Sequence, residues 1–474
     1  MFALSEIIRA LTGQQLFERD RLFSEAKIDS RHVISGSLFV AIPGENTDGH
    51  DYISEAFRRG AFAALVEKDL PEHFTCLDFR STVKEIVLPN PLPPFPFCIQ
   101  VDNTVVALQK IATLHRDLLD LKTIGITGTV GKSTTKELVA EVVSQQYHTL
   151  KNIGNLNNEI GLPLTLLKAG KGHQLAILEM GFYVSGEIKL LCDIAKPIIG
   201  LITNIGTVHA ERAGSMEDIA NGKAELVEAL PADGVAILNY DDPYVLAMAQ
   251  KTKAHVFTYG LDPRANLWAD QIESYGLKGI RFCIHLNNEN FFVRIPLIGR
   301  HSVHTALRAC AVGKVLGMSW EQIFIGLNHG DTHLRMAVIN TQEGALVIDD
   351  TYNASPESMI AALNLLEEIE GYKIGILGEM LELGQYDEIG HMKVGAKAAE
   401  VCDELIAVGE KARTLVSSAI QTGMKLQRTQ WFATVPEVIE YIRKRGFTQG
   451  EVILVKGSRG LQMEQIVEVM EHKQ

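Results

Sequence analysis

The stretch GITGTVGKST, residues 125–134, has the residue types that bind the phosphates of a nucleotide. An apolar strand-like run precedes it, and the helix-forming sequence TTKELVAEVV follows it. Backbone N–H groups at a helix N-terminus attract anions, and glycines let the backbone approach them closely. In such a loop Lys132 would reach the terminal phosphates and Ser133 a magnesium ion. The strict P-loop pattern requires a glycine where this chain has Ile126, so we expect a nucleotide-binding loop of a variant class.

Phosphoryl transfer also needs a cation near the loop, and a carboxylate at a neighbouring strand end would hold it. Glu179, in the run LAILEMG, is the candidate magnesium ligand. His209 follows the strand-like run IGLITNIG, and Lys223 lies in a helical stretch behind it. Taken alone, such a histidine is usually structural, and a helix lysine two residues before Glu225 is usually a surface charge. The residues themselves therefore favour Glu179 and leave His209 and Lys223 open.

The composition excludes several classes of protein. A chain of 474 residues with 46% hydrophobic residues predicts about three packed domains. The formal charge of -13 argues against a nucleic-acid partner or an anionic membrane surface. The six cysteines include no C-x-x-C pair and no compact Cys/His cluster, so neither a disulfide framework nor a structural zinc site is expected. Without a signal peptide or a long apolar span, we expect a cytoplasmic monomer with no membrane insertion.

Strand-like and helical stretches alternate along most of the chain, which predicts mostly parallel sheets covered on both faces. Residues 1–101 mix short apolar runs with turn-rich pieces and include the proline-rich loop PNPLPPFP. A second alternation begins near Ala345. The expected fold class is α/β with three domains: a small N-terminal α/β domain (1–101), a central P-loop-type domain (102–330) and a C-terminal Rossmann-like domain (331–474).

Residues 127–133 match the form T-G-T-x-G-K-[ST], which resembles the loop of the Mur ligase superfamily. These ATP-dependent amide-forming enzymes include the peptidoglycan peptide ligases and the folylpolyglutamate synthases. The resemblance implies ATP and Mg²⁺ as cofactors, a His ligand to a second magnesium and a carbamylated lysine. Only a neutral lysine adds carbon dioxide, so a lowered pKa is required. The implied nucleotide contacts are Gly128, Thr129, Gly131, Lys132, Ser133, Thr134, Arg335 and Asp350; the metal ligands are Ser133, Glu179, His209 and Lys223; and the catalytic residues are Lys132, His209 and Lys223.

Three further stretches narrow the resemblance. Residues 28–56, with D-S-R, G-S-L-F-V-A and D-G-H, resemble the uridine-nucleotide-binding domain of two branches of the superfamily. GNLNNEIGLPLTLL and DDTYNASPESMIAAL resemble the pentapeptide-forming branch, and the likeness covers essentially the whole chain. It implies the substrates UDP-N-acetylmuramoyl-tripeptide and D-alanyl-D-alanine, joined through an acyl phosphate. The implied substrate-binding residues are Ser30, Arg31, Asp48, Gly49, His50, Asn157, Asn158, Tyr352 and Asn353.

Some positions depart from the family pattern. Ser302 and Thr305 stand where two asparagines are expected, the second of them near the adenine ring, and Ser355 replaces an asparagine in the third domain. A hydroxyl cannot offer the paired donor and acceptor of an amide. Three alternatives stay open: a sibling ligase with another amine substrate, an ATPase that makes no bond, and a regulatory protein without turnover. The general base and the third residue of the tripeptide, diaminopimelate or lysine, are also open.

Overall fold

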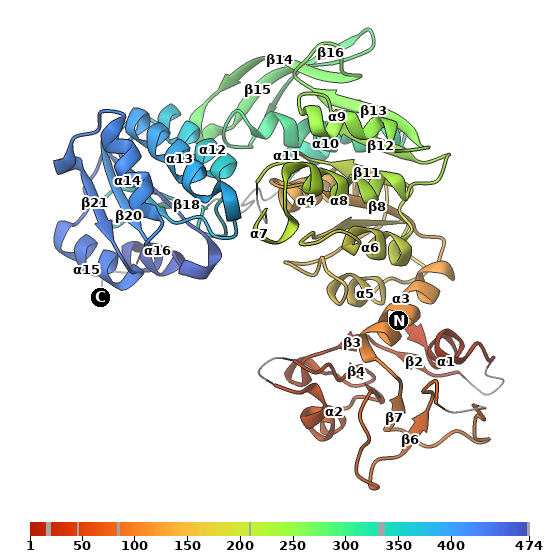
Figure 1. The fold of residues 1–474 in the computed structure, drawn as a ribbon. Helices are drawn as coiled ribbons and strands as arrows, with labels where there is room; N and C mark the ends of the chain where they lie inside the picture. Colours follow the sequence, from red (N-terminus) through yellow and green to blue (C-terminus); the bar gives the residue numbers. More distant parts are fainter. Residues whose placement is uncertain (16–19, 45–46, 83–85, 208–209, 330–336, 472–474) are drawn as a thin grey trace.

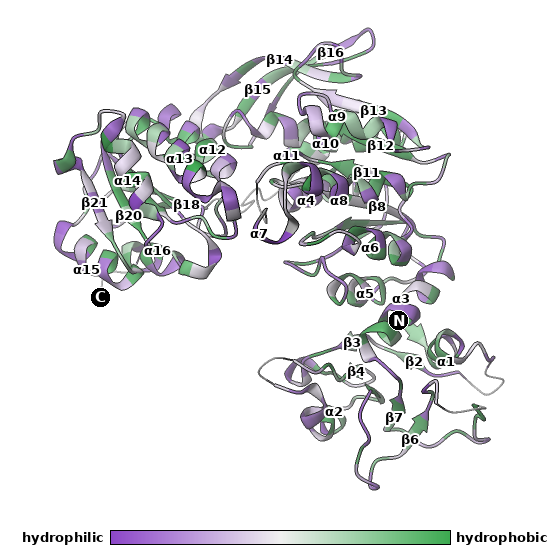
Figure 2. Cartoon of the chain, viewed as in Figure 1, coloured by the Kyte–Doolittle hydropathy of each residue, from purple (hydrophilic) through white to green (hydrophobic). Residues whose placement is uncertain are grey.

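The computed structural model describes residues 1–15, 20–44, 47–82, 86–207, 210–329 and 337–471. Three α/β units follow one another along the chain, each built on its own main sheet (Figure 1). The middle unit contacts both of the others, while the red-orange N-terminal unit and the blue C-terminal unit lie apart. Hydrophobic residues concentrate on the strands and hydrophilic residues on the outward helix surfaces (Figure 2). This partition is the one expected of sheets that are buried between helices.

The N-terminal unit is a parallel sheet with the strand order β3-β4-β5-β7-β6. Its elements are β3 (Ala26–Lys27), β4 (Leu38–Val40), β5 (Ala63–Val66), β6 (Cys76–Asp78), β7 (Phe97–Gln100), α1 (Leu4–Thr12) and α2 (Ile53–Arg58). A short antiparallel pair, β1 (Phe2–Ala3) and β2 (Leu22–Phe23), lies beside α1. One continuous apolar core runs from this unit into the middle unit through α3 (Thr104–Asp117), which therefore ties the two together.

The middle unit has the strand order β16-β15-β14-β13-β12-β11-β8-β10-β9. The strands from β9 to β14 pair in parallel, and β14, β15 and β16 pair antiparallel. The strands are β8 (Lys122–Thr127), β9 (Thr149–Lys151), β10 (Leu175–Glu179), β11 (Ile199–Ile202), β12 (Val235–Asn239), β13 (His255–Gly260), β14 (Leu267–Ser274), β15 (Ile280–Leu286) and β16 (Glu289–Ile295). The sequence analysis anticipated the parallel part but not the antiparallel extension, whose side chains alternate between a buried and a more exposed face.

Helices cover both faces of the central parallel part of this sheet, where side chains alternate between two apolar cores. On β10, Ala176 and Leu178 join one core, and Leu175 and Ile177 join the other. The helices are α4 (Lys132–Val143), α5 (Gly161–Leu166), α6 (Glu187–Ala195), α7 (Ala210–Ala213), α8 (Met216–Glu228), α9 (Pro243–Ala247), α10 (Ser302–Val315) and α11 (Trp320–His329). The carboxyl ends of β8, β10 and β11 meet at one sheet edge, where open α/β sheets bind ligands.

The C-terminal unit has the strand order β17-β18-β22-β19-β20-β21, parallel except for β17. Its strands are β17 (Ala337–Asn340), β18 (Leu346–Asp349), β19 (Tyr372–Gly378), β20 (Glu404–Val408), β21 (Thr429–Phe432) and β22 (Glu451–Lys456). Its helices are α12 (Pro356–Glu368), α13 (Asp387–Val401), α14 (Ala412–Gln421), α15 (Val435–Arg445) and α16 (Glu464–Glu471). Helices on each face enclose a separate core.

The expected α/β fold class with mostly parallel sheets is confirmed. The expected boundary at residues 101 and 102 falls between β7 and α3, and the one at 330 and 331 falls outside the described residues. These boundaries stay predictions. Within the described residues, no helix combines the length and apolar character needed to cross a bilayer.

Candidate active site

The predicted phosphate loop joins β8 to α4. Gly128 has φ +142° and Gly131 has φ +81°, a backbone conformation that favours glycine. A Cβ on Gly128 would lie 1.9 Å from the hydroxyl oxygen of Thr203. Gly131 caps the N-terminus of α4, whose first residue is Lys132. The loop therefore wraps the positive end of a helix, which is the local geometry of an anion site.

Residues that directly follow β11 form hydrogen bonds to the phosphate loop. The side-chain oxygen of Asn204 accepts from the Val130 N–H (2.9 Å), and its amide donates back to the Val130 carbonyl (3.0 Å). The Thr203 hydroxyl donates to the same carbonyl (2.8 Å), and the Thr129 hydroxyl accepts from the Gly206 N–H (2.8 Å). The role of Asn204 was not predicted from the sequence. Its position directly after an apolar strand was the available signal, and only the β8–β11 pairing shows that it reaches the loop.

Two cations flank the loop. The Lys132 ammonium folds over it and donates to the carbonyls of Gly128 (2.9 Å) and Thr129 (3.0 Å). Arg308, on α10, is buried, and its guanidinium lies 3.1 Å from where a Cβ of Gly131 would stand. Lys132 lies where the sequence predicted it, whereas Arg308 was not anticipated. The predicted contact residue Thr134 lies in the first turn of α4.

The predicted magnesium ligands Ser133 and Glu179 lie in direct contact. The Ser133 hydroxyl donates to one carboxylate oxygen of Glu179, and the Asn157 amide donates to the other at 2.9 Å. Glu179 ends β10 and is buried at 3% exposure. A hydroxyl and a carboxylate supply the hard oxygen ligands that Mg²⁺ prefers. The residues present therefore fit a magnesium ion beside the phosphate loop.

A buried lysine and asparagine hold Glu179 in place. Asn152 accepts from the Glu179 N–H (3.0 Å) and donates to the Glu179 carbonyl (3.0 Å). The Lys136 ammonium donates to the Asn152 carbonyl (2.7 Å) and lies 3.9 Å from a carboxylate oxygen of Glu179. Neither residue was predicted from the sequence. Lys136 follows the loop by one helical turn, but a helix lysine with no visible burial signal is indistinguishable from a surface residue.

Lys223 is buried in α8, with its ammonium 4.6 Å from the centre of the Phe182 ring. Gly222 leaves room for that ring, because a Cβ there would lie 2.1 Å from it. Burial, and next the charge of Lys132, hold the pKa of Lys223 well below its ordinary value. A lowered pKa favours the neutral amine, which is the form that adds carbon dioxide. The predicted chemistry of Lys223 is therefore physically possible, and its metal role stays a prediction.

Glu225 has a structural role at the surface of α8. Its carboxylate accepts from the backbone N–H groups of Gly186 (2.7 Å) and Lys189 (2.9 Å). These groups belong to the N-terminal end of α6, where a negative charge is favourable. The acidic residue thus ties α8 to α6, and the lysine two residues earlier turns inward.

In the C-terminal unit the predicted residues gather after β18. Lys456, buried at the end of β22, donates to the Asp350 carboxylate (2.7 Å) and to the Asn353 carbonyl (2.8 Å). The guanidinium carbon of Arg459 lies over the Tyr352 ring, 5.2 Å from the ring centre. Ser355 caps α12 by accepting from the Ser358 N–H at 3.2 Å. A serine is as suitable as an asparagine for this capping position.

The N-terminal predictions form a separate group. His50 accepts from the Glu67 N–H through Nε2 (3.0 Å), so its Nδ1 carries the proton and donates to Asp48 (2.7 Å). A Cβ on Gly49 would lie 2.6 Å from the Ile42 nitrogen, so close packing requires this glycine. Both ring nitrogens of His50 therefore form hydrogen bonds within the protein, and these bonds fix the conformation of the loop that contains Asp48 and Gly49.

Ser30 is buried at the start of a short helical turn, and the exposed Arg31 forms a two-pronged ion pair with Asp29. Asn158 accepts from the Gly161 N–H (2.8 Å) near the start of α5, so it does not share the Asn157 contact with Glu179. Two predicted residues, His209 and Arg335, lie outside the described residues.

The two unusual positions lie on α10, with Thr305 about one turn and Ser302 nearly two turns before Arg308. Ser302 begins this helix, and its hydroxyl donates to the Ile298 carbonyl (2.7 Å). Thr305 is buried on the same helix. Both hydroxyl residues therefore belong to the same helix as Arg308, the cation beside the phosphate loop that the sequence did not predict.

The comparisons with known proteins agree with this geometry. Residues 23–87 match the model "Mur ligase family, catalytic domain", residues 126–313 "Mur ligase middle domain", and residues 334–459 "Mur ligase, glutamate ligase domain". The chain is 34% identical to UDP-N-acetylmuramoyl-tripeptide–D-alanyl-D-alanine ligase of Bacillus subtilis (strain 168), over 98% of this chain and 96% of that protein.

Two solved structures extend the likeness to three dimensions. A crystal structure of MurF from Acinetobacter baumannii has a TM-score of 0.83 at 29% identity, covering 99% of this chain and 98% of that one. MurF ligase from Thermotoga maritima in complex with ADP has a TM-score of 0.79 at 26% identity, covering 94% and 97%. With three family models, a full-length relative and a phosphate loop beside a buried carboxylate, the chain belongs to the Mur ligase family.

Proposed function

We propose that this chain joins D-alanyl-D-alanine to UDP-N-acetylmuramoyl-tripeptide at the expense of ATP, giving the pentapeptide precursor of peptidoglycan, ADP and phosphate. One combined observation carries the proposal. A phosphate loop whose Ser133 contacts the buried Glu179 lies in a chain that is similar over 98% of its length to a ligase named for this reaction. The ADP bound to the similar Thermotoga maritima structure supports ATP as the nucleotide.

The phosphate groups of ATP would lie at the N-terminus of α4, against the N–H groups of the loop. Lys132 is within reach of them, since its ammonium already lies over the loop. The charge of Arg308 lies behind the same turn and adds to the positive potential there. These groups would stabilise the negative charge of the phosphoryl group as it is transferred.

Ser133 and Glu179 would hold a magnesium ion, with Asn157 and Lys136 orienting the carboxylate. When bound, the ion offsets the charge repulsion between the phosphates and an incoming carboxylate. The resemblance adds a second ion, held by His209 and a carbamylated Lys223, and the buried, low-pKa environment of Lys223 supports that part of the proposal.

The tripeptide carboxylate would attack the γ-phosphate, and ADP would leave, so that a poor acyl donor becomes a reactive acyl phosphate. The free amine of D-alanyl-D-alanine would then attack the acyl carbon, and the tetrahedral intermediate would release phosphate. Water must be kept from the acyl phosphate during this sequence, because hydrolysis would waste ATP. The enzyme would act in the cytoplasm, as a monomer.

Exclusion of water requires the middle and C-terminal units to close around the substrates. Their described contacts include the Thr207 hydroxyl with Glu357 (3.5 Å) and the Glu211 N–H with the Glu382 carbonyl (3.3 Å). These two bonds are long or at the surface, whereas the part-buried bond that the Ser274 hydroxyl donates to Glu368 joins the same units and would have to be kept or broken on closure. Small-angle scattering should show a smaller radius of gyration when ATP and the UDP-linked tripeptide are added together. An unchanged radius would contradict closure.

The reaction itself is tested by phosphate release from ATP and Mg²⁺ with the UDP-linked tripeptide, with and without D-alanyl-D-alanine. We expect release to require the dipeptide, and mass spectrometry to show a nucleotide product heavier by one dipeptide less water. The Lys132→Ala variant is the control for contaminating ATPase. Phosphate release indifferent to the dipeptide would identify a hydrolase, and activation by another amine would identify a sibling ligase.

A further inference from the structure

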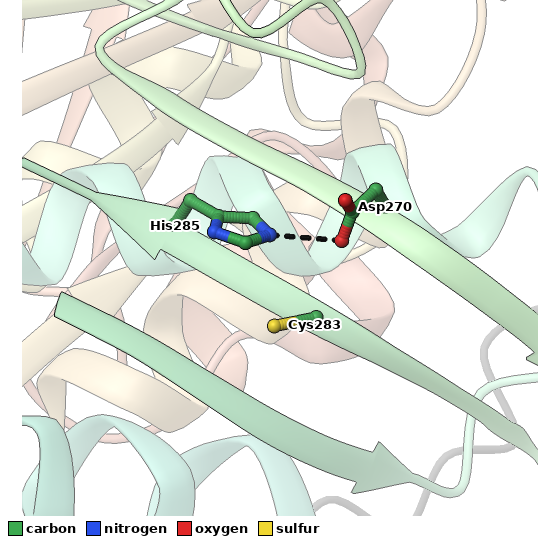
Figure 3. A group of neighbouring side chains, drawn as sticks. All are labelled: Asp270, Cys283 and His285. Carbon is green, nitrogen blue, oxygen red and sulfur yellow. Dashed lines mark hydrogen bonds and ion pairs between the residues drawn. The ribbon is translucent and has the colours of Figure 1, made fainter.

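Three side chains with metal-binding atoms meet on the antiparallel extension of the middle sheet (Figure 3). They are Asp270 on β14, and Cys283 and His285 on β15, and their ligand atoms all lie within 4.8 Å of one another. No structural zinc site was expected from the sequence, because no compact Cys/His cluster was apparent there. Asp270 is distant from Cys283 along the chain, and only the strand pairing brings it opposite that residue.

Strand geometry explains why these residues converge. Cys283 and His285 are two residues apart on one strand, so both side chains emerge on the same face. Asp270 pairs directly with Cys283 across the antiparallel ladder, and Trp268 pairs with His285. The other face of these strands, which includes Phe282 and Ile284, packs into an apolar core. The cluster therefore lies on the face of the extension opposite that core.

The side chains are partly arranged for coordination. His285 Nε2 lies 2.8 Å from an Asp270 carboxylate oxygen, and the Trp268 ring stacks on the imidazole with centres 3.8 Å apart. Ligand atoms around a tetrahedral Zn²⁺ are separated by roughly 3.3–3.6 Å, given the usual bond lengths. No separation here exceeds 4.8 Å, so a contraction of at most about 1.3 Å is required, which side-chain rotation can supply.

Charge and exposure favour a cation at this place. Cys283 is buried, whereas the Asp270 side chain is 42% exposed, so one side of the cluster is open to water. The neighbouring Arg281 is paired with Glu273 at 3.2 Å, which offsets its positive charge. A thiolate, an imidazole and a carboxylate together select a borderline-soft metal rather than magnesium.

We propose that Asp270, Cys283 and His285 form a binding site for a zinc-class divalent cation, with water as the fourth ligand. Binding releases the thiol proton of Cys283, and the proton that His285 Nε2 donates to Asp270 moves to Nδ1 or to solvent, so that two metal bonds replace the Asp270–His285 hydrogen bond. The metal links β14 to β15 next to the irregularity in their pairing between Asp270 and Glu273. In the strand order β14 and β15 lie four and five positions from β8, about 19–24 Å away at about 4.8 Å per strand, so the site is separate from the phosphate loop of the proposed ligase reaction.

Cobalt substitution in the full chain tests this site. The chelator-treated enzyme is titrated with Co²⁺ in excess Mg²⁺, which occupies the hard-oxygen site at Ser133 and Glu179. We expect one equivalent of Co²⁺ with a sulfur-to-cobalt charge-transfer band and the intense visible bands of tetrahedral coordination, both abolished by Zn²⁺. Cys283→Ser and His285→Gln should weaken binding by more than about 100-fold, beyond the loss typical of an outer-shell change. The matched controls Cys76→Ser and His255→Gln, at exposed positions, should keep the wild-type spectrum.

A second measurement covers the case in which Cys283→Ser does not fold. Co²⁺ bound to His285 should quench the fluorescence of the stacked Trp268, and Trp268→Phe should remove that quenching. Asp270→Asn, which leaves the buried thiol intact, should also lose the charge-transfer band. The proposal is overturned if the wild-type enzyme shows no sulfur-to-cobalt band, or if folded His285→Gln or Cys283→Ser keeps it.

Discussion

Asn157 and Asn158 are adjacent, chemically identical residues with different contacts, and replacing each with alanine separates two roles. The Asn157 amide donates to Glu179 at 2.9 Å, whereas Asn158 accepts from the Gly161 N–H at 2.8 Å. If Glu179 holds magnesium, Asn157→Ala should weaken the metal site. Asn158→Ala should instead destabilise the start of α5 and leave the metal site unchanged.

The magnitude follows from the contacts that remain. A hydrogen bond to an ionised carboxylate contributes about 1.5–3 kcal/mol, which corresponds to about 10- to 150-fold in affinity. Ser133 and Lys136 still hold the other oxygen of Glu179 in the variant, so the lower part of that range applies. We expect a 10- to 50-fold rise, in order of magnitude, in the Mg²⁺ concentration for half-maximal rate. Asn158→Ala should cost about 0.5–2 kcal/mol of stability, as the loss of a helix cap does.

The assay is the initial rate of phosphate release against Mg²⁺ concentration at saturating ATP and both other substrates, combined with thermal unfolding of each variant. Asn157→Ala should shift the magnesium curve with little change in the unfolding temperature, and Asn158→Ala should do the reverse. An unshifted magnesium curve in Asn157→Ala, together with a raised KM for the tripeptide or the dipeptide, would refute the positioning role. It would support direct substrate contact instead.

Three other changes have definite expected outcomes. Gly128→Ala should lower kcat/KM at least about 100-fold, because the new Cβ would lie 1.9 Å from the Thr203 hydroxyl and the backbone conformation at this position is strained for alanine. Titration with ADP should show that the variant already binds the nucleotide more weakly. Lys223→Ala should abolish activity, with partial rescue by bicarbonate or a short carboxylic acid; full activity of the wild-type enzyme after thorough removal of carbon dioxide would argue against carbamylation. His50→Ala should destabilise the N-terminal unit by about 2–3 kcal/mol through two lost hydrogen bonds, seen as faster hydrogen exchange there, and unchanged exchange would show that the loop holds without it.

The residues that lie where the sequence pattern placed them are those whose geometry depends on neighbours in the chain. The glycines of the phosphate loop, Lys132 and Ser133 lie at the start of α4 because strand, turn and helix signals follow one another within a few residues. Glu179 required one further step, that strands of a parallel sheet end at the same edge.

The supporting residues were not predictable in the same way. Asn204, Lys136 and Arg308 act on the loop or on Glu179 across strand and helix contacts, and their local sequence is that of ordinary polar residues. The burial of Lys223 depends on the packing of α8 against Phe182. When a polar helix residue faces inward because of a single side chain that is distant in the sequence, the hydrophobic periodicity of the helix does not identify that residue.

By itself the sequence determined the α/β class, the phosphate loop and the order in which the glycines, the lysine and the serine of that loop follow one another. These features follow from local periodicity and from motifs of consecutive residues. Only the tertiary structure decided how the carboxylate of Glu179 is held, that Lys223 is buried, and that Asp270 stands opposite Cys283 and His285. Strand register and helix packing bring together residues that are far apart in the chain. These long-range contacts arise from the cooperative burial of apolar surface, which leaves no local signature at the polar residues that it brings into contact.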